Sequence, residues 1–157
     1  MSITTVCAGI VAIVNALPAV TVGTTNYTLR AVDPPPEKFD TAELPGVYVL
    51  SGPATYDWQS AGSDGGYETR QYRVGVAIEA SGQSITPKVE ARARVFIPVL
   101  RDAFASYPLL GTANARNSQV VSDTGVGFLT AYDNNLTGFE IILSVEEYVE
   151  RDYATNE

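Results

Sequence analysis

The chain has 157 residues, of which 45% are hydrophobic and 18% charged, and its formal net charge is −8. This length predicts one compact domain over residues 1–157, and the composition predicts a hydrophobic core. The acidic balance argues against free nucleic-acid binding, which depends on clustered cations. Histidine is absent and Cys7 is the single cysteine, which excludes Ser/His and Cys/His nucleophiles, an internal disulfide and a cysteine-rich metal site.

Apolar side chains recur at helical spacing near the start of the chain. The run passes through Ile3, Val6 and Ile10, and Pro18 ends it. A secretory signal would need a positive segment before this run, yet the first cation is Arg30. A membrane span needs about 20 apolar residues, which is longer than this run. We therefore expect a helix packed on a sheet or between subunits.

Two strand patterns follow the helix. Residues 20–30 are rich in β-branched side chains and predict a strand that is interrupted near Gly23. Asp33 and the three prolines after it predict an extended connection, followed by a polar loop to Pro45. Residues 46–50 form a short apolar run that is typical of a strand buried on both faces.

Residues 51–66 are predicted to be a long loop, because they are rich in glycine and polar residues between two strand patterns. A connection above about 12–15 residues without secondary structure is usually functional or disordered. This one carries Tyr56 and the only tryptophan, Trp58. Such an aromatic pair suits contact with a partner, and the alternative is that Trp58 folds back onto the domain's own surface.

The clearest pattern in the chain is a strand followed by a long helix, residues 67–107. Alternation predicts a strand with one buried face, formed by Tyr72, Val74, Val76 and Ile78. From Ser84, the expected N-cap, the period changes to three and four residues. The resulting helical stripe comprises Val89, Ala93, Phe96, Leu100, Ala103 and Phe104. Pro98 lies halfway along this helix and is expected to kink it.

The last third of the chain predicts a hairpin. Residues 112–119 are expected to be a polar loop, and the strands to be 120–130 and 137–149. The turn is Asp133-Asn134-Asn135. This turn resembles the start of a calcium loop, but Ser144 stands where such a loop has its bidentate glutamate. Residues 146–157 predict a flexible acidic tail.

The sequence contains no catalytic signature. Asp57, Asp64 and Glu68 could be combined into an acid/base set, but they lie on or beside the predicted loop, which is poor pre-organisation for catalysis. We therefore expect no enzyme activity, no cofactor and no metal site.

Opposite charges gather in two parts of the chain. The predicted helix carries the cations Lys88, Arg92, Arg94 and Arg101, and the C-terminal region carries the acids Glu146, Glu147 and Glu150. A basic face and an acidic face can pair head to tail between copies, which builds rings. The alternative is that the helix cations face solvent and contact no neighbouring copy.

Three residue runs carry a resemblance to a known family. They are Gly46-Val-Tyr-Val-Leu-Ser-Gly-Pro-Ala-Thr-Tyr-Asp-Trp58, Arg70-Gln-Tyr-Arg-Val-Gly-Val76 and Arg94-Val-Phe-Ile-Pro-Val-Leu-Arg-Asp-Ala-Phe104. With the order of the predicted elements, the chain resembles the tail terminator (tail completion, head–tail joining) proteins of long-tailed bacteriophages. This resemblance, one of layout and size over most of the chain, implies an α+β domain with helices packed on one face of a mixed or mostly antiparallel sheet.

The resemblance also implies a function. A structural virion protein of this kind forms a ring, typically a hexamer, that caps the tail tube, stops its polymerisation and joins it to the head-side neck protein. It is assembled in the bacterial cytoplasm, without a membrane, and an acidic lumen lets DNA pass without specific binding. Tyr56 and Trp58 would then contact a neighbour or the tube, and the helix cations would meet a neighbour's acids.

Two other functions remain open at this point. One is a different neck component, such as the head-completion stopper. The other is a small-ligand or carbohydrate-binding module, in which Trp58 and Tyr56 would form a stacking platform.

Overall fold

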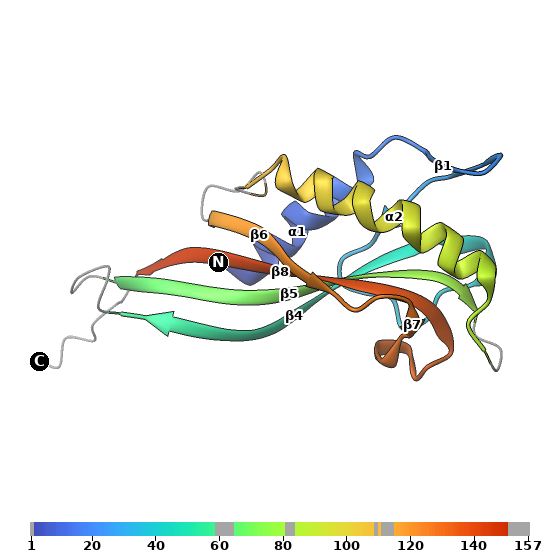
Figure 1. Ribbon diagram of the computed structural model, residues 1–157. Helices are drawn as coiled ribbons and strands as arrows, with labels where there is room; N and C mark the ends of the chain where they lie inside the picture. Colours follow the sequence, from blue (N-terminus) through green and yellow to red (C-terminus); the bar gives the residue numbers. More distant parts are fainter. Residues whose placement is uncertain (1, 59–64, 81–83, 109, 111–114, 151–157) are drawn as a thin grey trace, which may run out of the picture.

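Two helices and a curled sheet make up the protein, for which a computed structural model describes residues 2–58, 65–80, 84–108, 110 and 115–150 (Figure 1). The helices are α1 (Ser2–Asn15) and α2 (Pro87–Ala105), and short 3₁₀ turns lie at Thr41–Glu43 and Thr130–Tyr132. The strands are β1 (Val20–Val22), β2 (Thr25–Tyr27), β3 (Arg30–Ala31), β4 (Gly46–Asp57), β5 (Gly65–Ala80), β6 (Ala115–Asp123), β7 (Gly127–Phe128) and β8 (Leu136–Glu150).

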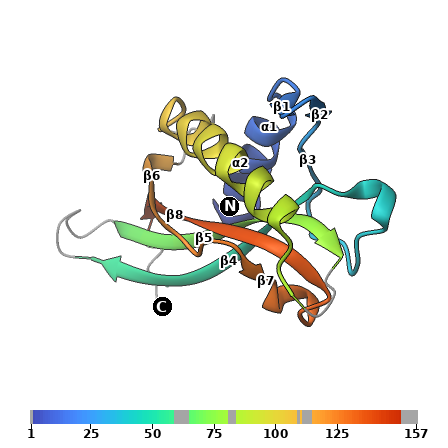
Figure 2. The same ribbon diagram turned by 45° about the vertical axis from the view of Figure 1, so that its right-hand side comes forward.

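The main sheet has the strand order β3-β4-β5-β8-β6, and β7 pairs with β8. The β3–β4 pair is parallel and the other pairs are antiparallel. Both helices lie on the same face of this sheet, α2 crossing it diagonally (Figure 2). The expected α+β class, with one small domain and a mixed, mostly antiparallel sheet, is therefore confirmed.

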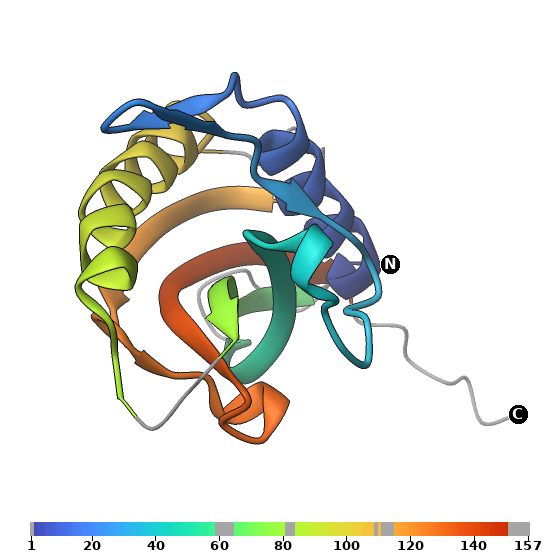
Figure 3. The ribbon, with the colours of Figure 1, turned by 90° about the vertical axis from the view of Figure 1, so that its right-hand side faces the viewer.

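One hydrophobic core lies between the helices and the sheet. It joins Val6, Ile10 and Val14 of α1 to the α2 stripe and to the alternating residues of β5 and β8. Viewed along the strands, the β1–β2 hairpin spans the top of this layer, between the two helices (Figure 3). The predicted strand face is confirmed, and the helical stripe is confirmed except at Ala103, which is only half-buried.

A second, smaller core covers part of the opposite sheet face. Tyr48, Ala77, Leu129 and Leu136 are buried there, with Phe39 and Tyr132 packed against them. Residues 46–50 are therefore enclosed on both faces at the β4 end near β3, as their apolar run predicted.

The prediction of a loop over residues 51–66 is wrong where the structure describes that segment. β4 continues to Asp57 and β5 begins at Gly65, so the two strands form one long antiparallel pair. The glycines have a packing reason: side chains at Gly65 and Gly66 would collide with Tyr148 and Trp58. Residues 59–64 lie outside the described part.

Several boundaries also differ from the sequence prediction, and the strand expected over 120–130 is divided into the end of β6 and the short β7. Thr86 rather than Ser84 caps α2: its hydroxyl accepts from the Val89 amide at 3.4 Å and donates to Glu79 at 2.9 Å. β6 starts at Ala115, inside the expected 112–119 loop, because its residues find partners along β8. Residues 146–150 belong to β8 rather than to a flexible tail, and 151–157 lie outside the described part.

Several local predictions are confirmed. The interruption near Gly23 is the turn of the β1–β2 hairpin, where Gly23 has φ of 63°. The turn of the last hairpin places Asp133 and Asn134 at positive φ, a conformation that Asp and Asn tolerate. Pro98 lies inside α2, and the kink there stays a prediction.

Candidate interaction surface

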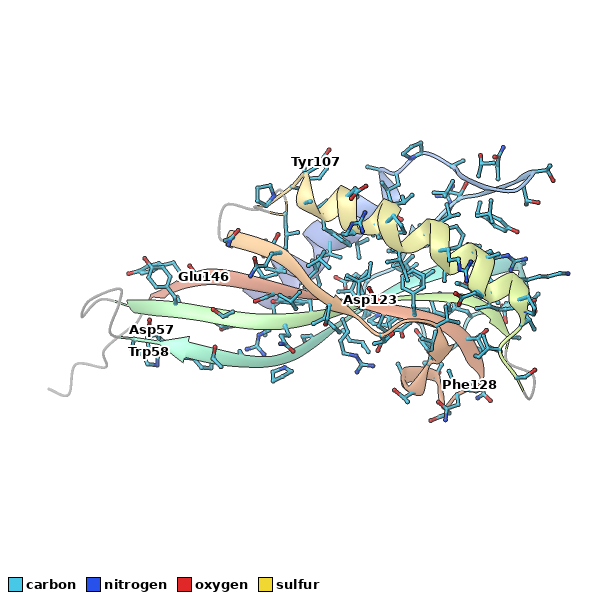
Figure 4. The ribbon with its side chains drawn as sticks, in the orientation of Figure 1. Asp57, Trp58, Tyr107, Asp123, Phe128 and Glu146 are labelled. Carbon is cyan, nitrogen blue, oxygen red and sulfur yellow. The ribbon has the colours of Figure 1, made fainter. Side chains whose placement is uncertain are left out.

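The strands β4, β5 and β8 extend past the helices at one end of the sheet and form an arm, at whose base β6 pairs with β8 from Ser144 to Glu147. We define the arm as residues 51–58, 65–71 and 144–149; Asp57, Trp58 and Glu146 mark it at the left of Figure 4. Its strands remain paired in register, from Ala54 opposite Arg70 to Asp57 opposite Tyr67. The arm is thus an ordered continuation of the sheet.

The arm's helix-side face carries a stacked aromatic pair. The Tyr56 and Trp58 rings lie 5.8 Å apart at 6°, and Trp58 packs on Gly66. Tyr56 is 51% exposed and Trp58 36%. The structure therefore brings these two predicted residues together and fixes them against their own domain, while leaving part of each ring at the surface.

Arg70 holds this face together. Its Nε donates to Glu68 Oε1 at 2.6 Å, Nη1 to the Gly52 carbonyl at 2.8 Å and Nη2 to the Tyr56 hydroxyl at 3.2 Å. The hydrogen bond to Glu68 raises the pKa of the Arg70 guanidinium, which stays charged. Glu147 lies opposite Glu68 in the ladder and is 1% exposed, so this predicted interface residue is inside the protein.

The opposite face of the arm, which we call the outer face, is acidic and aromatic. The register places Asp57, Tyr67, Glu146 and Tyr148 on it. The rings of Tyr67 and Tyr148 meet edge to face at 5.8 Å, and Tyr148 is 42% exposed. Asp57 and Glu68 lie on opposite faces of the sheet, so they form no acid/base pair. Asp64 and the Glu150 side chain are outside the described part.

The four predicted cations of α2 differ in their surroundings. The guanidinium of Arg92 lies 5.0 Å from the centre of the Tyr27 ring, in a cation–π contact within the chain. Arg94 pairs with Glu90 at 3.0 Å and Arg101 with Asp102 at 3.1 Å, both at the surface. Lys88 is exposed and has no ion-pair partner among the described residues.

A second polar cluster crosses three strands beneath the smaller core. Tyr48 passes over Gly75 and donates to Glu140 Oε2 at 2.8 Å, while Arg73 Nη2 reaches both Glu140 oxygens at 2.7 and 2.8 Å. Burial, and then the Glu140 charge, raise the pKa of the Tyr48 hydroxyl. A cavity of about 350 Å³, lined in part by Pro36 and Tyr132, lies next to Arg73. This cluster cross-links the sheet and contains no nucleophile.

An apolar groove of about 410 Å³ lies between α1 and the end of α2. Its floor is formed by small and aliphatic side chains of α1, and Tyr107 and Leu110 form the opposite wall. The small residues Gly9 and Ala12 of α1, and Ala16 just after it, line this side of the groove. The groove carries no charged lining residue within the part of the chain that is described.

Cys7, the single cysteine of the chain, is buried. Burial, with a smaller contribution from Asp33, raises the pKa of the Cys7 thiol to about 11, so it is protonated at neutral pH. No group of three or more Asp, Glu or Cys suited to a metal occurs among the described residues. Among the same residues, no helix is both long and apolar enough to cross a membrane.

No protein-family model matches the sequence, and no curated protein matches it.

Sequence reasoning missed the arm and its outer face. The signal was present in residues 54–58, Ala-Thr-Tyr-Asp-Trp, which alternate small or polar with aromatic side chains, and in the paired glycines at 65 and 66. Recognising it would have required knowing that aromatic rings of neighbouring strands cover those glycines.

Proposed function

We propose that this chain is a structural virion protein that forms a ring on the end of a bacteriophage tail tube. The ring terminates tube polymerisation and offers its other side to the head-side neck protein. The observation that carries this proposal is the arm: an ordered, aromatic and acidic end of the sheet that projects past the helices (Figure 4). A projecting surface of this kind is suited to contact between subunits rather than to binding a small substrate.

Termination needs a subunit with two different ends. One end must match the growing tube, and the other must differ so that no further tube subunit adds. The arm and the helix α2, which crosses the sheet diagonally, differ in charge: the arm carries mostly carboxylates, and α2 carries four cations against two acids. Such unlike surfaces favour head-to-tail contacts, which close into rings when the rotation between copies allows it.

The net charge of −8 suits a ring through which DNA passes. An acidic wall repels the phosphate backbone, so the nucleic acid would move through the lumen without binding it.

The direct test is growth of tail tubes from purified tube protein with and without this chain. Addition of the chain at a few per cent of the tube subunits should stop elongation, and electron micrographs should show a ring at one tube end. Tubes of unchanged length and bare ends would contradict the proposal. If the ring instead binds only the head-side connector, the chain is the neck stopper.

The stacked Tyr56–Trp58 pair favours a second candidate, a carbohydrate-binding module. Aromatic rings exposed side by side can stack on sugar rings. Quenching of the single tryptophan by oligosaccharides would support this candidate, and the Tyr56→Ala variant should then lose the quenching. Unchanged fluorescence over a panel of glycans would exclude it.

A further inference from the structure

The outer edge of the sheet is open where β3 ends. β3 pairs with the start of β4, and its own outer side is closed by Asn15, whose side chain accepts from the Ala31 amide at 2.8 Å and donates to the Ala31 carbonyl at 3.0 Å. Among the described residues, no backbone hydrogen bond joins Val49–Ser51 of β4 to a segment other than β5. Pro53 and the bulge beside it end this stretch. A short part of β4 therefore presents a strand edge to which another strand can add.

A cavity lies on each side of this edge. The cavity on the helix side, of about 400 Å³, is lined by the first half of α1, by Asp33 and by Val49. The cavity on the opposite side is the one of about 350 Å³ next to Arg73. Leu50 and Pro35 line both cavities. Successive side chains of a strand point to opposite faces, so neighbouring residues of a strand added here would enter the two cavities in turn.

Asp33 gives the helix-side cavity its charge. The residue is exposed and forms no ion pair among the described residues, and it is the one charged residue among those described that line this cavity. Its charge contributes to the raised pKa of the Cys7 thiol, which places the carboxylate near a residue of the same cavity. Ile3 and Val49 are among the apolar walls. A cation on an apolar stem, as in a lysine or arginine side chain, matches this combination.

The cavity on the opposite side suits an apolar side chain. Leu50, Pro36 and Tyr132 are among the residues that line it. The guanidinium of Arg73 beside them is held by both oxygens of Glu140, at 2.7 and 2.8 Å, so its charge is already balanced.

We propose that an extended segment of a partner protein adds as a short strand to β4 at Val49–Ser51, with a lysine or arginine beside Asp33. The next residue of the segment, an apolar one, then lies beside Leu50 and Tyr132. In strand addition, main-chain hydrogen bonds supply affinity, and cavities for alternate side chains supply specificity. The site is complete in a single chain, so it goes beyond the proposed function and does not depend on a ring.

Binding of a synthetic peptide to the full-length chain tests the site. The probe is a fluorescein-labelled Thr-Val-Lys-Val-Thr peptide, whose lysine and valines point to opposite faces when it is extended. The dissociation constant, measured by fluorescence anisotropy, should rise at least about tenfold in Asp33→Asn or when glutamate replaces the peptide's lysine, because a charged partner is lost. Asp133→Asn is the matched control, because Asp133 lies in a turn and lines neither cavity. Equal affinity for the two peptides, or for wild type and Asp33→Asn, would overturn the proposal.

Methylation of the peptide's backbone nitrogens tests strand addition itself. The amides of an extended chain point alternately to its two edges, so methylation along one edge should abolish binding and methylation along the other should leave it unchanged. Bound peptide should also slow the alkylation of Cys7 by iodoacetamide, because Cys7 lines the helix-side cavity. Equal effects of the two methylation patterns, an unchanged alkylation rate, or n-butylamine that binds as tightly as the peptide would each overturn the proposal. Tube capping is measured separately, so failure here leaves the proposed function untouched.

Discussion

Single glycines decide where large side chains of this protein can lie. Gly75 of β5 is the clearest case, because the Tyr48 ring crosses directly over it to reach Glu140 on the far strand. The three residues form one transverse row of the sheet, Tyr48 opposite Gly75 and Gly75 opposite Glu140. The Tyr48 side chain can pass across β5 to Glu140 only because β5 has no side chain at Gly75.

Replacement of Gly75 by alanine should therefore destabilise the fold. The added methyl group would occupy the space of the buried Tyr48 ring, and such overpacking costs roughly 1–3 kcal/mol. Thermal unfolding followed by circular dichroism measures the loss. Gly127→Ala is the matched control, because a methyl group there meets nothing within 4 Å. Equal melting temperatures for the two variants would contradict this account of Gly75.

At the scale of elements, the sequence predicted what depends on regular periodicity. The 3.6-residue period identified α1 and α2, and the period of two identified β5 and β8, because each buries one face against the same core. Glycine content misled the prediction at residues 51–66. The sequence alone does not distinguish a glycine that lies beneath an aromatic ring from a glycine in a loop. The two cases differ in whether a neighbouring strand places an aromatic ring over the glycine, which only the fold determines.

Gly66→Val should disturb the arm without affecting the core. The new side chain would displace Trp58 from its packing position, and the stacked Tyr56 would lose its neighbour. Hydrogen exchange measured by mass spectrometry should then accelerate in peptides covering 51–58 and 65–71. Peptides from α2 and residues 139–143 serve as the internal control, since their side chains belong to the main core. Uniform acceleration across the chain would show instead that the arm and core unfold together.

For the whole molecule, the sequence predicted the class of fold but not the positions of its charges. Glu147 and Glu146 are adjacent in the acidic region, yet the alternation of β8 buries the former and places the latter on the outer face. Likewise, Arg92 and Arg94 are two residues apart on α2, and only Arg92 contacts the Tyr27 ring. Register and helix rotation determine these differences, and composition carries no information about either.

The stability of the whole molecule should fall in alkaline solution. Burial raises the pKa of Tyr48 and of Tyr72, with smaller contributions from Glu140 and Glu147 respectively. A raised folded-state pKa stabilises the fold below the unfolded value of about 10, and this contribution is lost as the pH rises further. The free energy of unfolding should decrease above about pH 10 by about 1.4 kcal/mol per pH unit for each tyrosine that stays protonated.

Urea denaturation between pH 8 and 11 measures this slope. Tyr48→Phe should reduce it, whereas Tyr107→Phe should not, because Tyr107 is 54% exposed. Identical slopes for the wild type and Tyr48→Phe would show that the buried hydroxyl has no part in the pH dependence.

The row that joins Tyr48, Gly75 and Glu140 also sets the register of the β5–β8 pair, which continues without a bulge into the arm. From Glu140 to Glu147, β8 runs about 23 Å as a paired strand, at roughly 3.3 Å per residue. A slip of one residue between β5 and β8 would move the β8 side chains of the arm to the opposite face of the sheet. The row therefore fixes, in every copy of the chain, that Glu147 is buried and that Glu146 lies on the outer face. Under the proposed function, every copy would therefore present the same faces of its arm to its neighbours.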